Sequence, residues 1–123
     1  MTTDLFSNAN LACTVVIPAA PQLDIEQYAA WPYPGMTAED CARSAISMSP
    51  EYADMLEAVI RSQGDADLTS DQIKALIPQD WRDLMGRWLY GGMCARVAER
   101  RGILATYVSH DGKGFHFSYR VAP

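Results

Sequence analysis

The sequence contains few of the residues that build metal centres or covalent frameworks. Its three cysteines, Cys13, Cys41 and Cys94, are scattered and odd in number, and its two histidines are His110 and His116. No Cys-x-x-Cys pair is present. We therefore expect neither a disulfide framework nor a metal site, and isolated thiols are typical of a reducing compartment.

Long apolar segments are also missing. No apolar run approaches the roughly 20 residues that cross a bilayer. The first four residues, Met-Thr-Thr-Asp, lack the basic start of a secretory signal. We therefore expect a cytoplasmic protein without a membrane partner. Its 123 residues, 49% hydrophobic and 20% charged, suit one globular domain with an additional arm.

Motifs of enzymes are absent as well. Neither histidine lies near a serine or cysteine in a recognisable nucleophile motif. The glycines at 91–92 and at 112 and 114 do not join a strand to a helix, as phosphate-binding glycine loops do. We expect no catalytic residues, no cofactor and no enzymatic activity.

Charge is present but unevenly spread. Residues 1–80 hold three basic side chains against twelve acidic ones, a net charge of −9, whereas residues 81–123 hold seven against three, a net charge of +4. The basic C-terminal third is suited to phosphate groups. The acidic front is suited to a basic protein surface, or serves only to keep the protein soluble.

Residues 49–123 carry the clearest structural signals. Ser49-Pro50 is a helix start, and apolar residues at helical spacing follow it as far as Gly64. Thr69 and Gln72 form a capping box for a second, short helix that ends at Pro78. A third helical region covers residues 81–101, capped by Asp80. The two glycines at 91–92 leave open whether it is one kinked helix or two.

The C-terminal end of the chain predicts a β-hairpin. Residues 103–108 are rich in β-branched and aromatic side chains, and residues 110–114 have the composition of a turn. Phe115, Phe117, Tyr119 and Val121 then alternate with polar residues, which indicates a half-buried strand with its aromatic side inward.

Residues 1–48 form an N-terminal extension. A strand is expected over residues 11–17, a short helix over 22–30, and a break at the proline- and aromatic-rich residues 31–35. Thr37 and Asp40 then begin another helix. Further along, Trp81 and Trp88 are seven residues apart and are expected to pack in the core.

Together these elements predict a helix-rich α+β fold: a winged helix of three helices and a hairpin at residues 49–123, preceded by the extension at 1–48. From Leu68-Thr69-Ser70-Asp71-Gln72-Ile73 to Arg101-Gly102-Ile103-Leu104, the chain resembles small winged-helix proteins of phages and prophages. The chain departs from that pattern in the additional residues 81–91 and in a wing with few basic residues. The resemblance implies a DNA-binding protein that regulates transcription.

Five basic residues are the candidate DNA contacts. In a winged helix the third helix enters the major groove and the wing touches the backbone. Arg96 and Arg100 lie four apart on one helical face and would make groove contacts, while Arg101, Lys113 and Arg120 would contact phosphates. The alternative is an ordinary solvated helix face.

A second function from another class fits the low basic density. The chain would then be a phage-encoded, protein-binding inhibitor of a host defence system, similar to an anti-CRISPR protein. Its contacts would come from the acidic front, or from Trp31 and Tyr33 in the rigid proline-rich segment. Either function is compatible with a homodimer formed through the first helix of the domain or the N-terminal strand.

Overall fold

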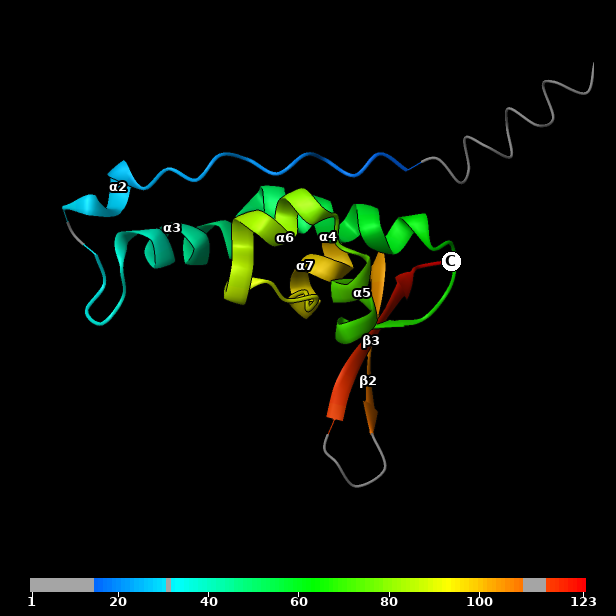
Figure 1. Cartoon of the computed structure of the whole chain (residues 1–123). Helices are drawn as coiled ribbons and strands as arrows, with labels where there is room; N and C mark the ends of the chain where they lie inside the picture. The colour runs from blue at the N-terminus through cyan, green and yellow to red at the C-terminus, as the bar shows by residue number, and fades with distance from the viewer. Residues whose placement is uncertain (1–14, 31, 110–114) are drawn as a thin grey trace, which may run out of the picture.

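The structure is a computed structural model that describes residues 15–30, 32–109 and 115–123 (Figure 1). It confirms a helix-rich α+β fold. The helices and strands, in chain order, are α2 (Glu26–Ala29), α3 (Ala38–Ser47), α4 (Pro50–Ser62), β1 (Leu68–Thr69), α5 (Ser70–Leu76), α6 (Gln79–Met85), the 3-10 helix η1 (Gly86–Trp88), α7 (Ala95–Arg100), β2 (Ile103–Ser109) and β3 (Phe115–Val121).

Helix α4 is the central element, and it begins as the sequence predicts. The Ser49 hydroxyl accepts a hydrogen bond from the Tyr52 backbone N–H, and Pro50 occupies the first helical turn. The predicted apolar stripe is buried, with Met55, Val59 and Ile60 fully inaccessible to solvent. The apolar stripe of α4 is therefore part of the core of its own chain.

The second helix, α5, carries the predicted capping box. The Gln72 N–H donates to the Thr69 hydroxyl over 3.2 Å, and the Gln72 side chain accepts from the Thr69 N–H over 2.9 Å. Leu68 and Ile73 are both buried on either side of this cap. The helix ends before Pro78, which lacks the N–H needed to continue it.

The third helical region is neither one kinked helix nor a simple pair. It divides into α6, the 3-10 turn η1, an extended stretch over residues 89–94, and the short helix α7. The expected cap at Asp80 is wrong, because α6 begins at Gln79, directly after Pro78, so that Asp80 lies within its first turn. The Asp80 carboxylate instead accepts hydrogen bonds from the N–H groups of Ala20 and Trp81.

Gly91 allows the extended stretch to cross α5 at close range. A Cβ atom on Gly91 would lie 2.0 Å from the Ser70 carbonyl oxygen and 2.7 Å from the Lys74 nitrogen. Both are backbone atoms in a helix, so neither can move aside at low cost. The glycine therefore sets how closely the segment leading into α7 approaches α5.

The predicted hairpin is confirmed, and β1 adds a third strand to it. The antiparallel sheet has the order β1-β3-β2, with β2 and β3 in register from Ile103↔Val121 to Ser109↔Phe115. Tyr119 anchors the sheet to the helices: its ring is 2% exposed, and its hydroxyl bonds both the N–H and the carbonyl of Met93. The start of α7 is thereby attached to β3.

The aromatic side of the hairpin is buried only at its base. Tyr119 is inaccessible, but Phe117 is 36% exposed and Tyr107, directly opposite it, is 60% exposed. Figure 1 shows the reason: the outer half of the hairpin extends beyond the helices. The expected inward direction of the aromatic side is therefore correct for Tyr119 and wrong for Phe117, where no helix is present to cover the ring.

The N-terminal extension packs on the helices. Residues 15–25 run extended along the side of the molecule opposite the hairpin (Figure 1). The Trp81 indole N–H donates to the Pro18 carbonyl over 2.7 Å, and Ile17 contacts the core. Residues 15–17 pair with no strand of the described residues, and residues 11–14 of the expected strand lie outside the described ranges. The short helix contracts to Glu26–Ala29.

The helix of the extension, α3, is capped as predicted and attached to the body. The Asp40 N–H donates to the Thr37 hydroxyl over 3.1 Å. The Asp40 carboxylate binds the Arg87 guanidinium at 2.6 Å and the Trp88 indole N–H at 3.2 Å. Trp81 is fully buried and Trp88 partly so, which confirms the expected packing of both rings.

Candidate nucleic-acid interface

Helix α7 separates its side chains into an inner and an outer side. Ala98 is fully buried and Val97 packs against the core, whereas Arg96, Glu99 and Arg100 are exposed. The four-residue spacing of Arg96 and Arg100 places them on one face. Neither arginine makes a side-chain hydrogen bond or ion pair with the residues that the structure describes. They are the predicted groove contacts, and the structure leaves both accessible.

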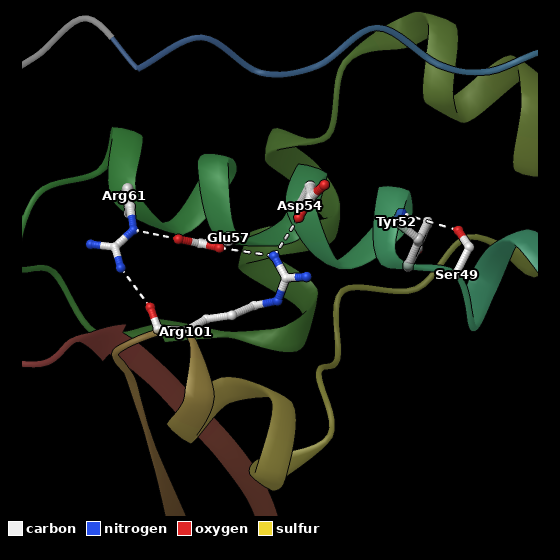
Figure 2. Close-up of polar contacts among 6 residues, drawn as sticks. All are labelled: Ser49, Tyr52, Asp54, Glu57, Arg61 and Arg101. Carbon is white, nitrogen blue, oxygen red and sulfur yellow. Dashed lines mark hydrogen bonds and ion pairs between the residues drawn. The ribbon is translucent and has the colours of Figure 1, made fainter.

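Arg101, one residue beyond α7, faces the opposite way. Its Nη1 lies 2.5 Å from Asp54 Oδ1 and 2.9 Å from Glu57 Oε1, both on α4 (Figure 2). Hydrogen bonds from the guanidinium to Asp54, and then to Glu57, raise the pKa of Arg101 above its ordinary value. This predicted phosphate contact is therefore already paired with two carboxylates.

Arg61 completes the same network. Its Nε binds Glu57 at 2.8 Å and its Nη2 donates to the Arg101 carbonyl at 2.6 Å, as Figure 2 shows. Two arginines and two carboxylates thus connect α4 to the junction between α7 and β2. We call Asp54, Glu57, Arg61 and Arg101 the α4–α7 clamp. Its four charges balance, so it contributes no net positive potential.

Of the other two predicted phosphate contacts, the structure describes Arg120 and does not bring it together with Arg96 and Arg100. Arg120 is exposed on β3, with its Nε 3.8 Å from Asp67 Oδ1. It alternates with Tyr119 along the strand, so it lies on the sheet face opposite the one that contacts Met93 before α7. Lys113 lies outside the described residues.

Most of the remaining arginines bind groups within the chain. Arg82 donates to the carbonyls of Ile77 and Lys74, and Arg87 pairs with Asp40. Arg43 donates to the Leu84 carbonyl and pairs with Glu39. Among the basic residues in the described ranges, the side chains without such a partner are those of Lys74, Arg96 and Arg100. Lys74, which no motif of the sequence distinguishes, is exposed on α5.

Cys94 marks the start of α7. The Cys94 thiol is exposed, because Cys94 is the residue before the first helical turn. Hydrogen bonds from the backbone N–H groups of Arg96 and Val97 lower the pKa of Cys94, and the positive charges of Arg96 and Arg100 lower it further. The thiol is therefore a chemical probe placed beside the two exposed arginines.

The alternative contact residues lie at the other end of the molecule. Tyr33 is 70% exposed, and its backbone N–H donates to the Cys41 Sγ of α3 over 3.2 Å. A cavity of about 430 Å³ beside it is lined by Tyr28, Met36 and Ser44. Trp31 lies outside the described residues. An exposed tyrosine here is compatible with a protein contact.

Comparison of the chain with protein-family models, curated protein sequences and solved structures finds no match. In the described ranges, no three or more histidine, cysteine or acidic side chains are grouped so that they could hold a metal ion. Nor does any helix of those ranges combine the length and apolarity required to cross a bilayer.

Proposed function

We propose that this chain is a non-enzymatic winged-helix protein that binds duplex DNA as a regulator. The observation that carries the proposal is the order of its elements. Helix α4, strand β1, helix α5, further helices and a two-stranded hairpin follow one another, and the sheet has the order β1-β3-β2. A helix-turn-helix unit closed by a β-hairpin is a DNA-binding architecture.

Helix α7 is the groove-facing element in this proposal. It directly precedes the hairpin and exposes Arg96 and Arg100, the two arginines without an acidic partner among the described residues. A guanidinium on such a helix can bind a guanine edge through two hydrogen bonds, or a phosphate. Lys74 on α5 supplies a third accessible cation. Helix α6 is less suitable, because its Trp81 and Met85 are buried in the core and the Trp81 indole N–H donates to the Pro18 carbonyl of the N-terminal extension.

The small number of unpaired basic side chains predicts how steeply the affinity for DNA depends on salt. Each phosphate neutralised on duplex DNA contributes about −0.9 to the slope of log K against log salt. With two to four contacts, we expect a shallow slope of roughly −2 to −4. Fluorescence anisotropy with labelled duplexes, measured at several salt concentrations, gives this slope directly.

Three variants that each remove one positive charge locate the interface. Arg96→Ala and Arg100→Ala should each weaken binding about tenfold and reduce the slope by about one. Arg87→Ala is the control, because Arg87 is paired with Asp40 on the α3 side. Binding that is insensitive to salt, or equal losses in all three variants, would contradict the proposal.

Cys94 provides a second test that needs no change to the arginines. DNA lying on α7 should slow alkylation of the Cys94 thiol, whereas the buried thiol of Cys41 should react slowly with or without DNA. A Cys13→Ser background removes the remaining cysteine. Unchanged alkylation of Cys94 at saturating DNA would place the nucleic acid away from the start of α7.

One observation favours the second candidate, a protein-binding inhibitor of a host defence system. The internal pairing of the arginines leaves exposed acidic side chains in excess, among them Glu51, Asp65, Asp71 and Asp83. Tyr33 adds an exposed aromatic ring. This function predicts capture of a protein complex from a bacterial host lysate, lost in Tyr33→Ala, by a chain with no salt-sensitive DNA binding.

A further inference from the structure

The outer side of α7 carries a carboxylate as well as its two arginines. Val97 packs against the core and Ala98 is fully buried, so these two residues set the direction of the inner side. With about 100° between successive residues of a helix, the direction opposite them falls between Arg96 and Glu99, which are about 60° apart. Both side chains are exposed, as is that of Arg100. Glu99 is therefore among the residues that point most directly away from the body.

The Glu99 carboxylate is unpaired in the described ranges, although arginines stand beside it. It forms no ion pair with Arg96 three residues before it or with Arg100 next to it, and it accepts no side-chain hydrogen bond there. A negative charge on a face that meets phosphates weakens the attraction of the two arginines for DNA. A carboxylate at this place lowers the affinity for any duplex unless the duplex offers it a hydrogen-bond donor.

The major groove of DNA offers a carboxylate two kinds of donor, the amino groups of cytosine and of adenine. The adenine N6 amino group lies beside N7, an acceptor that repels a carboxylate, whereas cytosine presents its N4 amino group alone. The guanine paired with that cytosine presents O6 and N7, which an arginine binds through two hydrogen bonds. A carboxylate beside a guanidinium therefore matches the two bases of a C·G pair.

The spacing along α7 fits this match. Arg96 and Glu99 are about 4.5 Å apart along the helix axis, and successive base pairs are about 3.4 Å apart. Arg96 is the second residue of α7, and the first residues of a recognition helix are those that contact base edges. The two side chains can therefore reach the same base pair or adjacent ones.

We infer that Glu99 is a specificity-determining residue, whose carboxylate accepts a hydrogen bond from cytosine N4 while Arg96 binds guanine O6 and N7 of the same pair or the adjacent one. The chain then selects duplex DNA that has a C·G pair at this place. This role of Glu99 rests on the proposed DNA binding by α7. An ordinary solvated glutamate would lower the affinity for all duplexes equally, whereas a base contact also makes the affinity depend on one base pair.

Selection from a duplex library with a randomised centre identifies the preferred site of the full chain, and fluorescence anisotropy then compares the four possible base pairs at each position. The unmodified chain should prefer C·G at one position by at least about fivefold. In Glu99→Gln, whose amide matches adenine, the preference at that position should move to A·T. In Glu99→Ala no pair should be preferred there. Both variants should bind duplexes without the site at least about twofold more tightly.

Glu51→Gln is the matched control. It removes the same charge by the same change at an exposed site on α4, where Glu51 lines a cavity with Gln22 and Ala42 on the side of the N-terminal extension. Salt-sensitive DNA binding with the same base preference in the unmodified chain and both Glu99 variants, or an equal change in Glu51→Gln, would overturn the role of Glu99 and leave the proposed DNA binding standing. Absence of salt-sensitive binding to every duplex would overturn both.

Discussion

The two sides of α7 use the same residue type for different purposes. On the inner side, Arg101 meets Asp54 and Glu57, which stand three residues apart on α4 and so face the same way. On the outer side, Arg96 and Arg100 meet no acidic group in the described residues. A count of arginines therefore overstates the positive charge that is free to meet a ligand. An arginine is available to a ligand only where the fold places no carboxylate or carbonyl opposite it.

The largest expected loss of stability comes from a substitution that displaces the whole of α7. In Gly91→Ala, the new methyl group would meet the Ser70 carbonyl and the Lys74 nitrogen of α5 at distances that no real contact allows. The segment before α7 must then move, and we expect a loss of about 3 kcal/mol in the free energy of unfolding. Urea denaturation measures this loss.

Gly92→Ala is the matched control for that change. A Cβ atom on Gly92 would meet the Tyr90 ring at 2.8 Å, and Tyr90 is 50% exposed and can turn away. The expected loss is about 1 kcal/mol. If Gly91→Ala cost no more than Gly92→Ala, the close crossing over α5 would not be what positions α7.

The next largest loss of stability comes from removing the ion pairs on the inner side of α7 alone. Arg101→Ala deletes two charge-assisted hydrogen bonds from a side chain that is only 22% exposed, so we expect a loss of about 1–2 kcal/mol. A double-mutant cycle with Asp54→Asn should give a coupling energy of about 1 kcal/mol. A coupling energy near zero would mean that the α4–α7 clamp is an ordinary solvated ion pair.

The sequence predicted the local features, helix caps and strand alternation, and did not predict the contacts between residues far apart in the chain. The capping residues Ser49 and Thr69 were recognisable because a cap and its partner lie within four residues. The alternation before Val121 likewise identified β3. The pairing of Arg101 with α4 was not predictable, because Asp54 is 47 residues away and only the fold brings the two together.

The exposed end of the hairpin and the exposed thiol were also not predictable from the sequence, because both depend on the fold. The alternation of Phe117 with polar residues is identical whether or not a helix covers the ring, so the sequence could not show where the body ends. Cys94 has the composition of a small apolar residue, and only the interruption of the helix after η1 makes it the capping residue that precedes α7. Strand β1 is two residues long, too short for any periodic pattern.

The contact of the N-terminal extension with η1 should make the stability of the fold depend on pH. The indole N–H of Trp88, followed by the positive charge of Arg87, lowers the pKa of Asp40 below the ordinary 3.8. A carboxyl with a lowered pKa in the folded state stabilises the fold above its unfolded pKa, and this contribution is lost as the pH falls through the lower folded value. Thermal unfolding from about pH 7 to about pH 2 should therefore depend less on pH in Asp40→Asn. An identical pH dependence in both proteins would mean that the contact between α3 and η1 does not form in solution.

The smallest expected effect on stability belongs to the two arginines on which the proposed DNA binding depends. Arg96→Ala and Arg100→Ala, combined in one chain, remove two exposed side chains from α7 and introduce a residue that favours helix. The free energy of unfolding should change by less than about 0.5 kcal/mol, while salt-sensitive DNA binding is lost. A loss above about 1 kcal/mol in urea denaturation would show that these arginines hold the fold together, as Arg101 does. The arginines on the two sides of α7 would then not differ in their contribution to stability. The proposal requires this difference, because an arginine that binds a ligand must be free of contacts that stabilise the fold.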